Sequence, residues 1–566
     1  MVWNKLRLCP CILAFLCLPI VVVFGDSHEQ TTERRILYNN DDCNWFGMLC
    51  YGETDPVRMK YLLEEEFVDR LAASGVDTLS VCLWDRFRSV GRSRITEYLV
   101  GPESYRFFPD WKPLYDAGMD PITIMSDRCR QRGMEFIMGM RMNDRHDDER
   151  FPKGRFIVNN PQWHLKGDLT PKRQRRKYGT RVDYTHDEVR QEVLDWIEEF
   201  LDTYDVDGIE LDYMRACHMF APGTGPENAH KLTEFTRRIR ELLNQAAKTR
   251  SKHYLQLGVR VPPSLEDCQF LGFDLKSWTT QKLVDYVCPS YYVRTDLNVP
   301  VEEFVDLLSN TECKVYPAIH HSAGFRSVPF LDGGTKLDIA GDLAIYRAAA
   351  SNYYAAGADG IQTYNYQHLA EDYGTRVENY SGEQFRNALS WIQELRNPKN
   401  VTRGDRRYVF FPLWWPSERT PDGQPEAKNE CGCSYQSPVV SLKRGKTGNT
   451  GHLNFRIAEK LGAPGQQVEL RFKAIGLDNA DSLTVTLNQF PVRGDILRQT
   501  SDRLNDLNFS TFTVPVQGEL ADQFVAHGNR IEFRLVSDSN AEQGNVTVAD
   551  LEVLVREISG SSKSSD

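Results

Sequence analysis

The sequence predicts a (β/α)8 barrel followed by a C-terminal β-sandwich, and three observations support this fold class. A unit made of a short apolar run, a few polar residues and a helical stretch recurs eight times between residues 35 and 367. The apolar runs are continuous, as in strands covered on both faces. Beyond residue 397, short alternating runs separated by Asn, Asp and Gly are typical of a sandwich. The alternative is an open doubly wound sheet, but no Gly-rich phosphate loop follows the first strand.

Each barrel strand is predicted where an apolar run ends in polar residues. These runs are Ile36–Asp41, Thr78–Asp85, Glu135–Asn143, Gly208–Tyr213, Leu255–Val261, Tyr286–Val293, Lys314–His321 and Gly360–Tyr366. Between the strands, apolar residues recur at helical spacing, as in Val193, Ile197 and Phe200. The same spacing covers residues 230–250 and 343–356, so strands and helices alternate through the first part of the chain.

These patterns divide the chain into five parts. They are a signal peptide (1–25), the barrel (26–397), a polar linker (398–408), the β-sandwich (409–557) and a Ser-rich disordered tail (558–566). The predicted sandwich strands are Gln467–Ala474, Ser482–Leu487, Phe509–Val514, Asn529–Val536 and Val546–Val555. Two roles stay open for the sandwich, which either binds carbohydrate or buttresses the barrel.

The amino terminus has the pattern of a secretory signal peptide. Lys5 and Arg7 precede an apolar run over residues 11–24, and the small residue Gly25 follows it. The run is shorter than the ~20 residues that a membrane span needs, so we expect cleavage rather than an uncleaved anchor. The mature protein is therefore expected to be secreted or periplasmic, with no membrane segment.

Composition and charge limit the classes of function. The 566 residues are 41% hydrophobic and 26% charged, which is enough apolar surface for a large core. The net charge of −11 argues against a general nucleic-acid binder, which normally carries a basic surface. Three of the 13 cysteines lie before residue 26, and the remaining even number permits disulfide bonds without fixing their pairs. No metal-ligand spacing is present, and neither metal nor cofactor is expected.

The polar residues at the carboxyl ends of the predicted strands form the candidate site. In barrels of this type these ends lie together at one mouth. The residues expected there are Asp41, Trp84, Arg141, Asn143, Asp144, Glu210, Asp212, Arg215, Arg260, Tyr291, Tyr292, His320, Tyr364 and Asn365. Carboxylates, basic groups and aromatic rings together suit a sugar, whose hydroxyls need hydrogen bonds and whose ring faces pack on aromatic platforms.

The segment from Tyr204 to Arg215 carries the sharpest signal. Side chains of a strand alternate in direction, so Glu210 and Asp212 share the face that points into the barrel. Two inward acids raise each other's pKa and are costly unless they are solvated or paired. Glu210 is therefore either a catalytic acid or a buried structural acid held by Arg260 or Arg141.

Three segments resemble a known group of proteins. They are Asp207-Gly208-Ile209-Glu210-Leu211-Asp212-Tyr213-Met214-Arg215, Leu257-Gly258-Val259-Arg260 and Val284-Asp285-Tyr286-Val287-Cys288-Pro289-Ser290-Tyr291-Tyr292. These segments resemble the fourth, fifth and sixth strands of the glycosyl-hydrolase-like barrel proteins of the "ten-like" group. The resemblance implies a barrel that hydrolyses O-glycosidic bonds.

Two positions depart from related patterns. Met214 stands where family 18 chitinases carry a glutamate, which argues against their substrate-assisted mechanism. Ala216-Cys217-His218 stands where the ten-like proteins often continue with an aromatic residue and a proline, so the rim loop differs.

A glycosidase usually needs two carboxyl groups, one of which donates a proton. Asp212 is the expected nucleophile or charge stabiliser. Glu210 is the first candidate for the acid because burial raises the pKa of a carboxyl, and Glu266 and Asp144 are the alternatives. Arg260 either orients a carboxylate, binds an acidic sugar or forms a structural ion pair.

A long connection over residues 145–185 contains Trp163, His164 and the basic run 172–177. It is either a solvated surface loop or a clamp over an anionic polysaccharide. Two further functions stay open: a non-catalytic carbohydrate-binding barrel, and a metal-dependent deacetylase suggested by Asp41-Asp42 and His320-His321.

Overall fold

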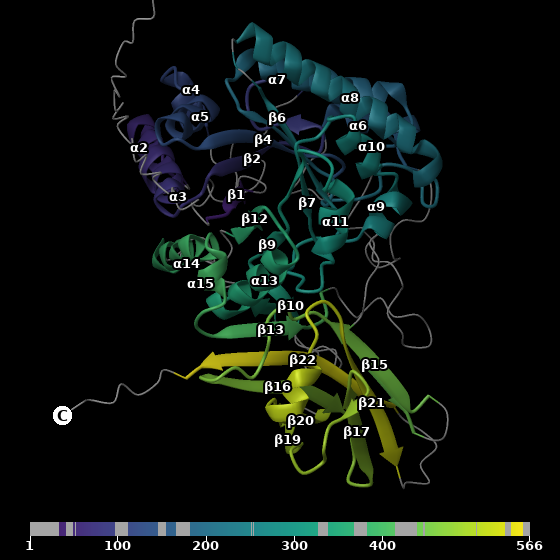
Figure 1. The fold of residues 1–566 in the computed structure, drawn as a ribbon. Coiled ribbons are helices and arrows are strands. Elements are labelled where there is room, and N and C mark those ends of the chain that lie inside the picture. The colour runs from purple at the N-terminus through teal and green to yellow at the C-terminus, as the bar shows by residue number, and fades with distance from the viewer. Residues whose placement is uncertain are drawn as a thin grey trace, which may run out of the picture.

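The computed structural model contains a barrel with helices around it and, below it in Figure 1, two packed antiparallel sheets. The structure describes residues 33–40, 49–50, 52–96, 111–144, 154–165, 181–250, 252, 254–325, 338–366, 382–413, 438–444, 448–504, 507–537 and 545–558. Within these ranges, no helix combines the length and the apolar character that crossing a bilayer requires. The predicted signal peptide lies outside the described residues.

The barrel strands pair in parallel and in the order of the chain. They are β1 (Arg35–Asn40), β2 (Thr78–Asp85), β4 (Glu135–Arg141), β5 (Gly208–Asp212), β6 (Gln256–Val261), β7 (Tyr286–Pro289), β8 (Lys314–Val315), β9 (Ala318–His320) and β12 (Gly360–Tyr364). β8 and β9 are two halves of one segment, and β8 pairs with β7 whereas β9 pairs with β12. Because β12 also pairs with β1, the sheet closes on itself. All eight predicted strands, and the predicted (β/α)8 fold, are confirmed.

Helices follow the strands and cover the outside of the barrel (Figure 1). They are α2 (Pro56–Tyr61), η2 (Leu62–Asp69), α3 (Arg70–Ala73), α4 (Lys112–Asp116), α5 (Pro121–Gln131), α6 (Arg155–Asn159), α7 (Asp187–Thr203), α8 (Gly225–Thr249), α9 (Leu265–Leu271), α10 (Leu275–Thr280), α11 (Val301–Leu308), α13 (Leu343–Ala355) and α14 (Gly382–Leu395). The predicted stripe of α7, including Val193, Ile197 and Phe200, is buried. Asp120 caps α5 by accepting hydrogen bonds from the backbone N–H groups of Ile122 and Thr123.

Inward-facing side chains plug the amino end of the barrel. Arg35 donates to the Thr78 hydroxyl and forms an ion pair with Glu135. Thr78 donates to Glu135 Oε2 at 2.9 Å, and Gln256 donates to Glu135 Oε1 at 2.8 Å. Four strands are thus joined by polar contacts at this end, so the barrel is a packed core rather than a pore.

The C-terminal unit is a β-sandwich, as predicted. One sheet contains β13 (Arg406–Phe410), β14 (Val440–Lys443), β16 (Gln466–Ile475), β19 (Arg498–Leu504), β20 (Leu507–Pro515) and β22 (Asn545–Glu557). The other contains β15 (Thr450–Phe455), β17 (Asp481–Leu487), β18 (Phe490–Pro491) and β21 (Asn529–Ser537). The five predicted strands correspond to β16, β17, β20, β21 and β22.

The barrel and the sandwich are joined by a packed interface. The segment predicted as a linker (398–408) forms the short helix α15 (Pro398–Val401) and the start of β13. Asn352 of α13 donates to the carbonyl of Arg456 at 3.0 Å and accepts from the N–H of Ala458 at 2.9 Å. Arg456 also pairs with Glu302 of α11. These contacts hold the sandwich against the barrel.

Candidate functional site

Asp212 and Arg260 form a buried ion pair at the carboxyl end of the barrel. They stand side by side at the ends of β5 and β6. Arg260 Nη1 lies 2.8 Å from Asp212 Oδ1 and 3.0 Å from Oδ2. The same carboxylate accepts the N–H of Met214 at 2.8 Å and the hydroxyl of Tyr364 at 3.2 Å. Asp212 is 4% exposed, so this predicted nucleophile lies beneath the surface, held by three neighbouring groups.

The guanidinium of Arg260 is held from several sides at once. Its Nη2 donates to the carbonyls of Tyr291 at 3.1 Å and Tyr292 at 2.7 Å, and its Nε donates to the Ser290 hydroxyl at 3.2 Å. The Tyr364 ring lies 3.5 Å from the guanidinium carbon. A buried charge is tolerated when it is paired and hydrogen-bonded in this way. These contacts fit two of the alternatives for Arg260, a group that orients a carboxylate and a structural ion pair.

A second group of charges lies on the neighbouring strands. Arg141 Nη1 is 2.7 Å from Asp144 Oδ2 and 3.7 Å from Asp85 Oδ2. Asp85 also contacts Arg86 Nη2 at 2.8 Å, and Arg215 Nε lies 3.9 Å from Asp144. Asp85, Asp144 and Asp212, three carboxylates of the described residues at this end of the barrel, therefore each contact an arginine.

Arg86 occupies a strained turn that the sequence analysis missed. Trp84 pairs with Ser89 and Asp85 with Arg88, so Arg86 and Phe87 form a two-residue hairpin loop. Both central residues have positive φ, 52° and 57°. Turns of this kind strongly prefer Asn and Gly, and each non-glycine residue costs of order 1–2 kcal/mol. Nothing in the local sequence signals the turn, because neither residue is a common turn former.

His320 joins the same cluster as a neutral side chain. Its Nε2 lies 3.0 Å from the Ser290 hydroxyl, which links it to Arg260. Burial, and then the positive charges of Arg260, His321, Arg294 and Arg215, lower the pKa of His320 well below 6.5. His320 therefore serves as a hydrogen-bonding group here rather than as a cation.

Glu210 lies deeper in the barrel and contacts donors from four strands. Its Oε1 accepts from Asn39 Nδ2 at 2.5 Å and from the Ser80 hydroxyl at 3.3 Å. Its Oε2 accepts from the Tyr286 hydroxyl at 3.1 Å and from Gln362 Nε2 at 2.6 Å. Burial, and then the charge of Asp212, raise the pKa of Glu210 to about 7.

This position argues against Glu210 as the proton donor. The side chain is 0% exposed, and inward side chains of the neighbouring strands surround it. The alternative interpretation, a buried structural acid, fits the contacts better. Its partners, however, are neutral side chains rather than the predicted Arg260 or Arg141.

Two predicted sugar contacts prove to be structural. Trp84 is 0% exposed and packs on Trp196 of α7 with ring centroids 4.5 Å apart, so it is not a platform at the mouth. Asn143 donates to the carbonyls of Val182 and His218 at 3.0 and 2.8 Å and accepts from the N–H of Val182. It therefore ties two rim segments together. Asn365 is buried with φ 53°, and Asp41 lies outside the described residues.

The structure places Glu266 at a cavity between the barrel and the sandwich. This cavity has a volume of about 360 Å³, and Glu266, Tyr291 and Thr295 are among its lining residues. Tyr292 instead lies beneath the guanidinium of Arg215, at 5.0 Å. The two neighbouring tyrosines thus have different surroundings.

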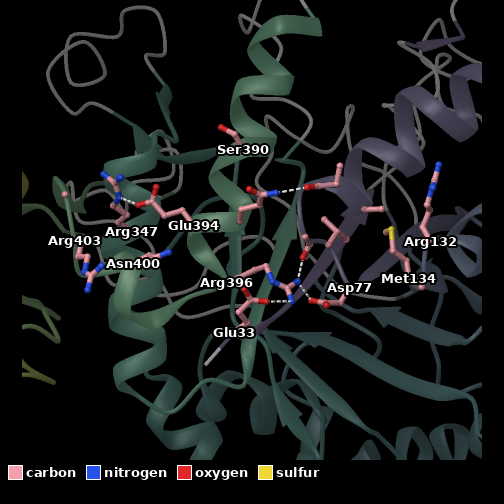
Figure 2. Close-up of a pocket in the computed structure, with 17 residues that line it drawn as sticks. Glu33, Asp77, Arg132, Met134, Arg347, Ser390, Glu394, Arg396, Asn400 and Arg403 are labelled. Carbon is pink, nitrogen blue, oxygen red and sulfur yellow. Dashed lines mark hydrogen bonds and ion pairs between the residues drawn. The ribbon is translucent and has the colours of Figure 1, made fainter. Parts of the chain in front are cut away.

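A larger cavity, of about 930 Å³, lies at the amino end of the barrel, opposite to the cluster. In Figure 2, Arg396 reaches Asp77 and Glu33, and Arg347 contacts Glu394. Arg396 Nη1 lies 2.8 Å from Asp77 Oδ2, which also accepts the N–H of Ile36. These contacts join the last barrel helix to β1 and β2, and this end of such barrels serves stability.

Other predictions concern the long connection and the cysteines. Trp163 stacks on Phe156, whose ring stacks on Phe87, so this part of the connection packs on the rim turn. The basic run 172–177 and Cys43, Cys431 and Cys433 lie outside the described residues. Within the described ranges, Cys50, Cys129, Cys268, Cys288 and Cys313 are buried free thiols, and Cys82 and Cys217 are buried as well. In those ranges no group of three or more His, Cys, Asp or Glu residues is arranged to hold a metal ion.

Comparison with known proteins assigns no family. No family model matches the chain, and no curated protein matches it. Among solved structures, the chain is similar to α-L-fucosidase isoenzyme 2 from Paenibacillus thiaminolyticus, at 12% identity and a TM-score of 0.40 over 65% of this chain and 49% of the fucosidase. The chain thus spans about half the length of that enzyme.

Two further structures give similar values. The PgaB glycoside hydrolase domain from Bordetella bronchiseptica is 12% identical, with a TM-score of 0.38 over 63% of this chain and 99% of that domain. A maltogenic α-amylase from Thermotoga neapolitana is 12% identical, with a TM-score of 0.36 over 89% of this chain and 99% of the amylase. Named carbohydrate hydrolases are therefore among the structures that the chain resembles, but these values assign it no activity.

Proposed function

We propose that the chain is an exported glycoside hydrolase that cleaves O-glycosidic bonds of a polysaccharide or oligosaccharide. The observation that carries this proposal is the cluster of Asp212, Arg260 and Tyr364 at the carboxyl end of a closed (β/α)8 barrel. Active sites of such barrels lie at this end. The amino-terminal pattern of Lys5, Arg7 and an apolar run supports export.

The contacts of Asp212 suit a group that stabilises positive charge. Arg260 and the Met214 N–H bind the ionised form of the carboxylate and fix its orientation. A carboxylate held in this way can attack the anomeric carbon or stabilise an oxocarbenium-like transition state. The hydroxyl of Tyr364, 3.2 Å from Oδ2, would support the same charge.

Asp144 is the remaining predicted candidate for the proton donor. It lies near Arg215 and is bound by Arg141 at 2.7 Å, whereas Glu210 is enclosed below and Glu266 faces another cavity. Asp144 must exchange its contact with Arg141 for the glycosidic oxygen before it can hold a proton. A substrate that moves inward would bring its glycosidic oxygen to Asp144 in place of Arg141.

The test compares the wild type with Asp212→Asn on a panel of polysaccharides, with analysis of the released sugars. The variant keeps the size of the side chain and removes the charge, so we expect turnover to fall by roughly a thousand-fold or more with little change in KM. Asp116→Asn, on an exposed helix residue, is the matched control. Equal product formation by the wild type and Asp212→Asn would refute the proposal.

A second function is favoured by one specific observation. Asp85, Asp144 and Asp212 each contact an arginine, and ion-paired carboxyls are poor proton donors. A barrel that binds carbohydrate without cleaving it would need no donor. Binding of a glycan without product, in the wild type as well as in Asp212→Asn, would identify this function.

A further inference from the structure

The cavity between the barrel and the sandwich has the features of a second ligand site. Its volume of about 360 Å³ lies at the lower end of the ~300–1,000 Å³ range of small-molecule sites. Both units contribute walls: Glu266, Tyr291 and Asn298 come from the barrel, and Phe411 and His527 from the sandwich. Such sites occur preferentially at domain interfaces.

The interface around the cavity is built to keep its shape. The Asn298 side chain accepts from the N–H of Arg456 at 3.1 Å, and Arg456 pairs with Glu302. The Asn352 side chain holds the backbone at Arg456 and Ala458 from the other side. A preformed cavity costs its ligand little in ordering of the protein.

The lining combines an apolar floor with a polar rim. Phe410, Phe411 and Phe455 are buried and form part of the floor, whereas Glu266 and Glu303 are exposed at the rim. Aromatic faces pack on the C–H side of a pyranose ring, and carboxylates accept hydrogen bonds from its hydroxyls. This combination matches a saccharide better than a purely apolar ligand.

The charges of the lining exclude an acidic ligand. Glu266, Asp296 and Glu303 face the cavity, whereas the cation Arg456 is engaged by Glu302. Burial raises the pKa of Asp296 to about 6, so this carboxyl is mainly ionised at neutral pH. A uronic or sulfated sugar would meet like charges, which disfavours its binding.

One loop separates this cavity from the Asp212 cluster. Tyr291 lines the cavity, and its carbonyl accepts from Arg260 on the other side. Thr295 also lines the cavity, and its hydroxyl exchanges hydrogen bonds with the backbone of His320 at 2.8 and 3.0 Å. A ligand in the cavity therefore contacts the outer face of the loop that positions Arg260.

We propose that the cavity between the barrel and the sandwich binds a short saccharide without acidic groups. The aromatic floor packs on a ring face, and Glu266, Asn298 and Glu303 bind its hydroxyls. The site is separate from Asp212, so it exists whether or not the barrel hydrolyses glycans.

The test fills the cavity without disturbing the fold. Gly528 lines the cavity, and a Cβ added there meets nothing within 4 Å. Gly528→Trp therefore adds a large ring at the cavity wall without a clash at Cβ, and we expect this ring to obstruct the cavity. Gly494→Trp is the matched control, because Gly494 is equally open and lies elsewhere on the sandwich. A second variant, Glu266→Gln with Glu303→Gln, removes rim charge from two exposed residues and should weaken binding without moving the fold.

Binding is measured by calorimetry on the full chain with trisaccharides of glucose, mannose, galactose, xylose, N-acetylglucosamine, glucosamine and galacturonic acid. We expect at least one of the first six to bind, a ten-fold or larger rise in Kd with Gly528→Trp, and no change with Gly494→Trp. Asp212→Asn should retain this binding even where it loses hydrolysis, which separates the two proposals. Binding of none of the six, preference for galacturonic acid, or equal affinity of Gly528→Trp would overturn the proposal.

Discussion

The buried Glu210 should make the stability of the barrel depend on pH in an unusual direction. Its pKa is raised from 4.5 to about 7 in the fold, so between these values the folded chain holds a proton that the unfolded chain has lost. The contribution of Glu210 is therefore complete below pH 4.5 and is lost as the pH rises to about 7. The raised pKa corresponds to a difference of about 3 kcal/mol in the free energy of unfolding.

His320 acts in the opposite direction over much of the same range. Because its pKa is lowered in the fold, the unfolded chain takes up a proton below pH 6.5 and the folded chain does not. The free energy of unfolding therefore falls as the pH falls, by up to about 1.4 kcal/mol per pH unit. Below pH 6.5 the two groups therefore act in opposite directions in the wild type.

Glu210→Gln should remove the contribution of Glu210 and leave that of His320. The amide keeps the shape of the side chain, and Gln362, whose Oε1 has no hydrogen-bond partner, can turn to accept the new N–H. We expect the variant to lose about 3 kcal/mol relative to the wild type as the pH falls from 7 to 4.5, because only the His320 contribution remains. Urea unfolding of both proteins at several pH values measures the difference.

Glu266→Gln is the control, because it changes an exposed carboxyl. Since Glu210 lies beneath the cluster, Glu210→Gln should also leave the rate of turnover within a few-fold of the wild type. A stability difference that does not change with pH would show that Glu210 is ionised in the fold. A thousand-fold slower turnover at unchanged stability would restore Glu210 as the proton donor.

Two further variants test other parts of the structure. Arg260→Lys should slow turnover more than ten-fold and lower the free energy of unfolding by roughly 3–5 kcal/mol, because an ammonium cannot reach Asp212, Ser290 and two carbonyls together. Kinetic assays and urea unfolding measure the two effects, and unchanged turnover would contradict the role assigned to Arg260. Trp84→Leu should lower the free energy of unfolding by about 3–5 kcal/mol, because the packing on Trp196 is lost, and it should leave the preference among glycans unchanged. Urea unfolding measures the first effect, and a changed glycan preference would place Trp84 at the site.

The barrel was predictable because its strands leave a strong local signal. Strands such as β2 and β4 contain long apolar runs, and even the segment divided into β8 and β9 keeps apolar residues around Pro317. The start of the sandwich was not predictable in the same way. Residues 398–408 are polar, and only the contact of β13 with β22 makes their second half a strand.

The prediction of side-chain directions at the rim failed where the backbone departs from regular alternation. Ser80 faces inward, and alternation would direct Cys82 and Trp84 inward as well. A bulge between Cys82 and Trp84 shifts the register, and Trp84 packs outward on Trp196. No residue in this segment signals the bulge, so the sequence could not reveal it.

Glu266 shows a different limit on prediction from sequence, which is that residues far apart in the chain can surround the same cavity. It follows the fifth barrel strand closely, so a place at the mouth was a reasonable expectation. The sandwich follows much later in the chain, and it contributes Phe411 and His527 to the cavity at whose rim Glu266 lies exposed. Local patterns contain no information about such a contact.

The difference between Glu210 and Asp212 is one of depth, and it decides their chemistry. Both side chains point inward, but two residues span about 7 Å along a strand. That step places Glu210 in a layer closed by donors from β1, β2, β7 and β12, and places Asp212 in the next layer, beside Arg260. Alternation predicts the face of each residue but not its layer. A molecule that enters from the rim must therefore meet Asp212 and its arginine before it can approach Glu210, so the two acids of one strand cannot share one role.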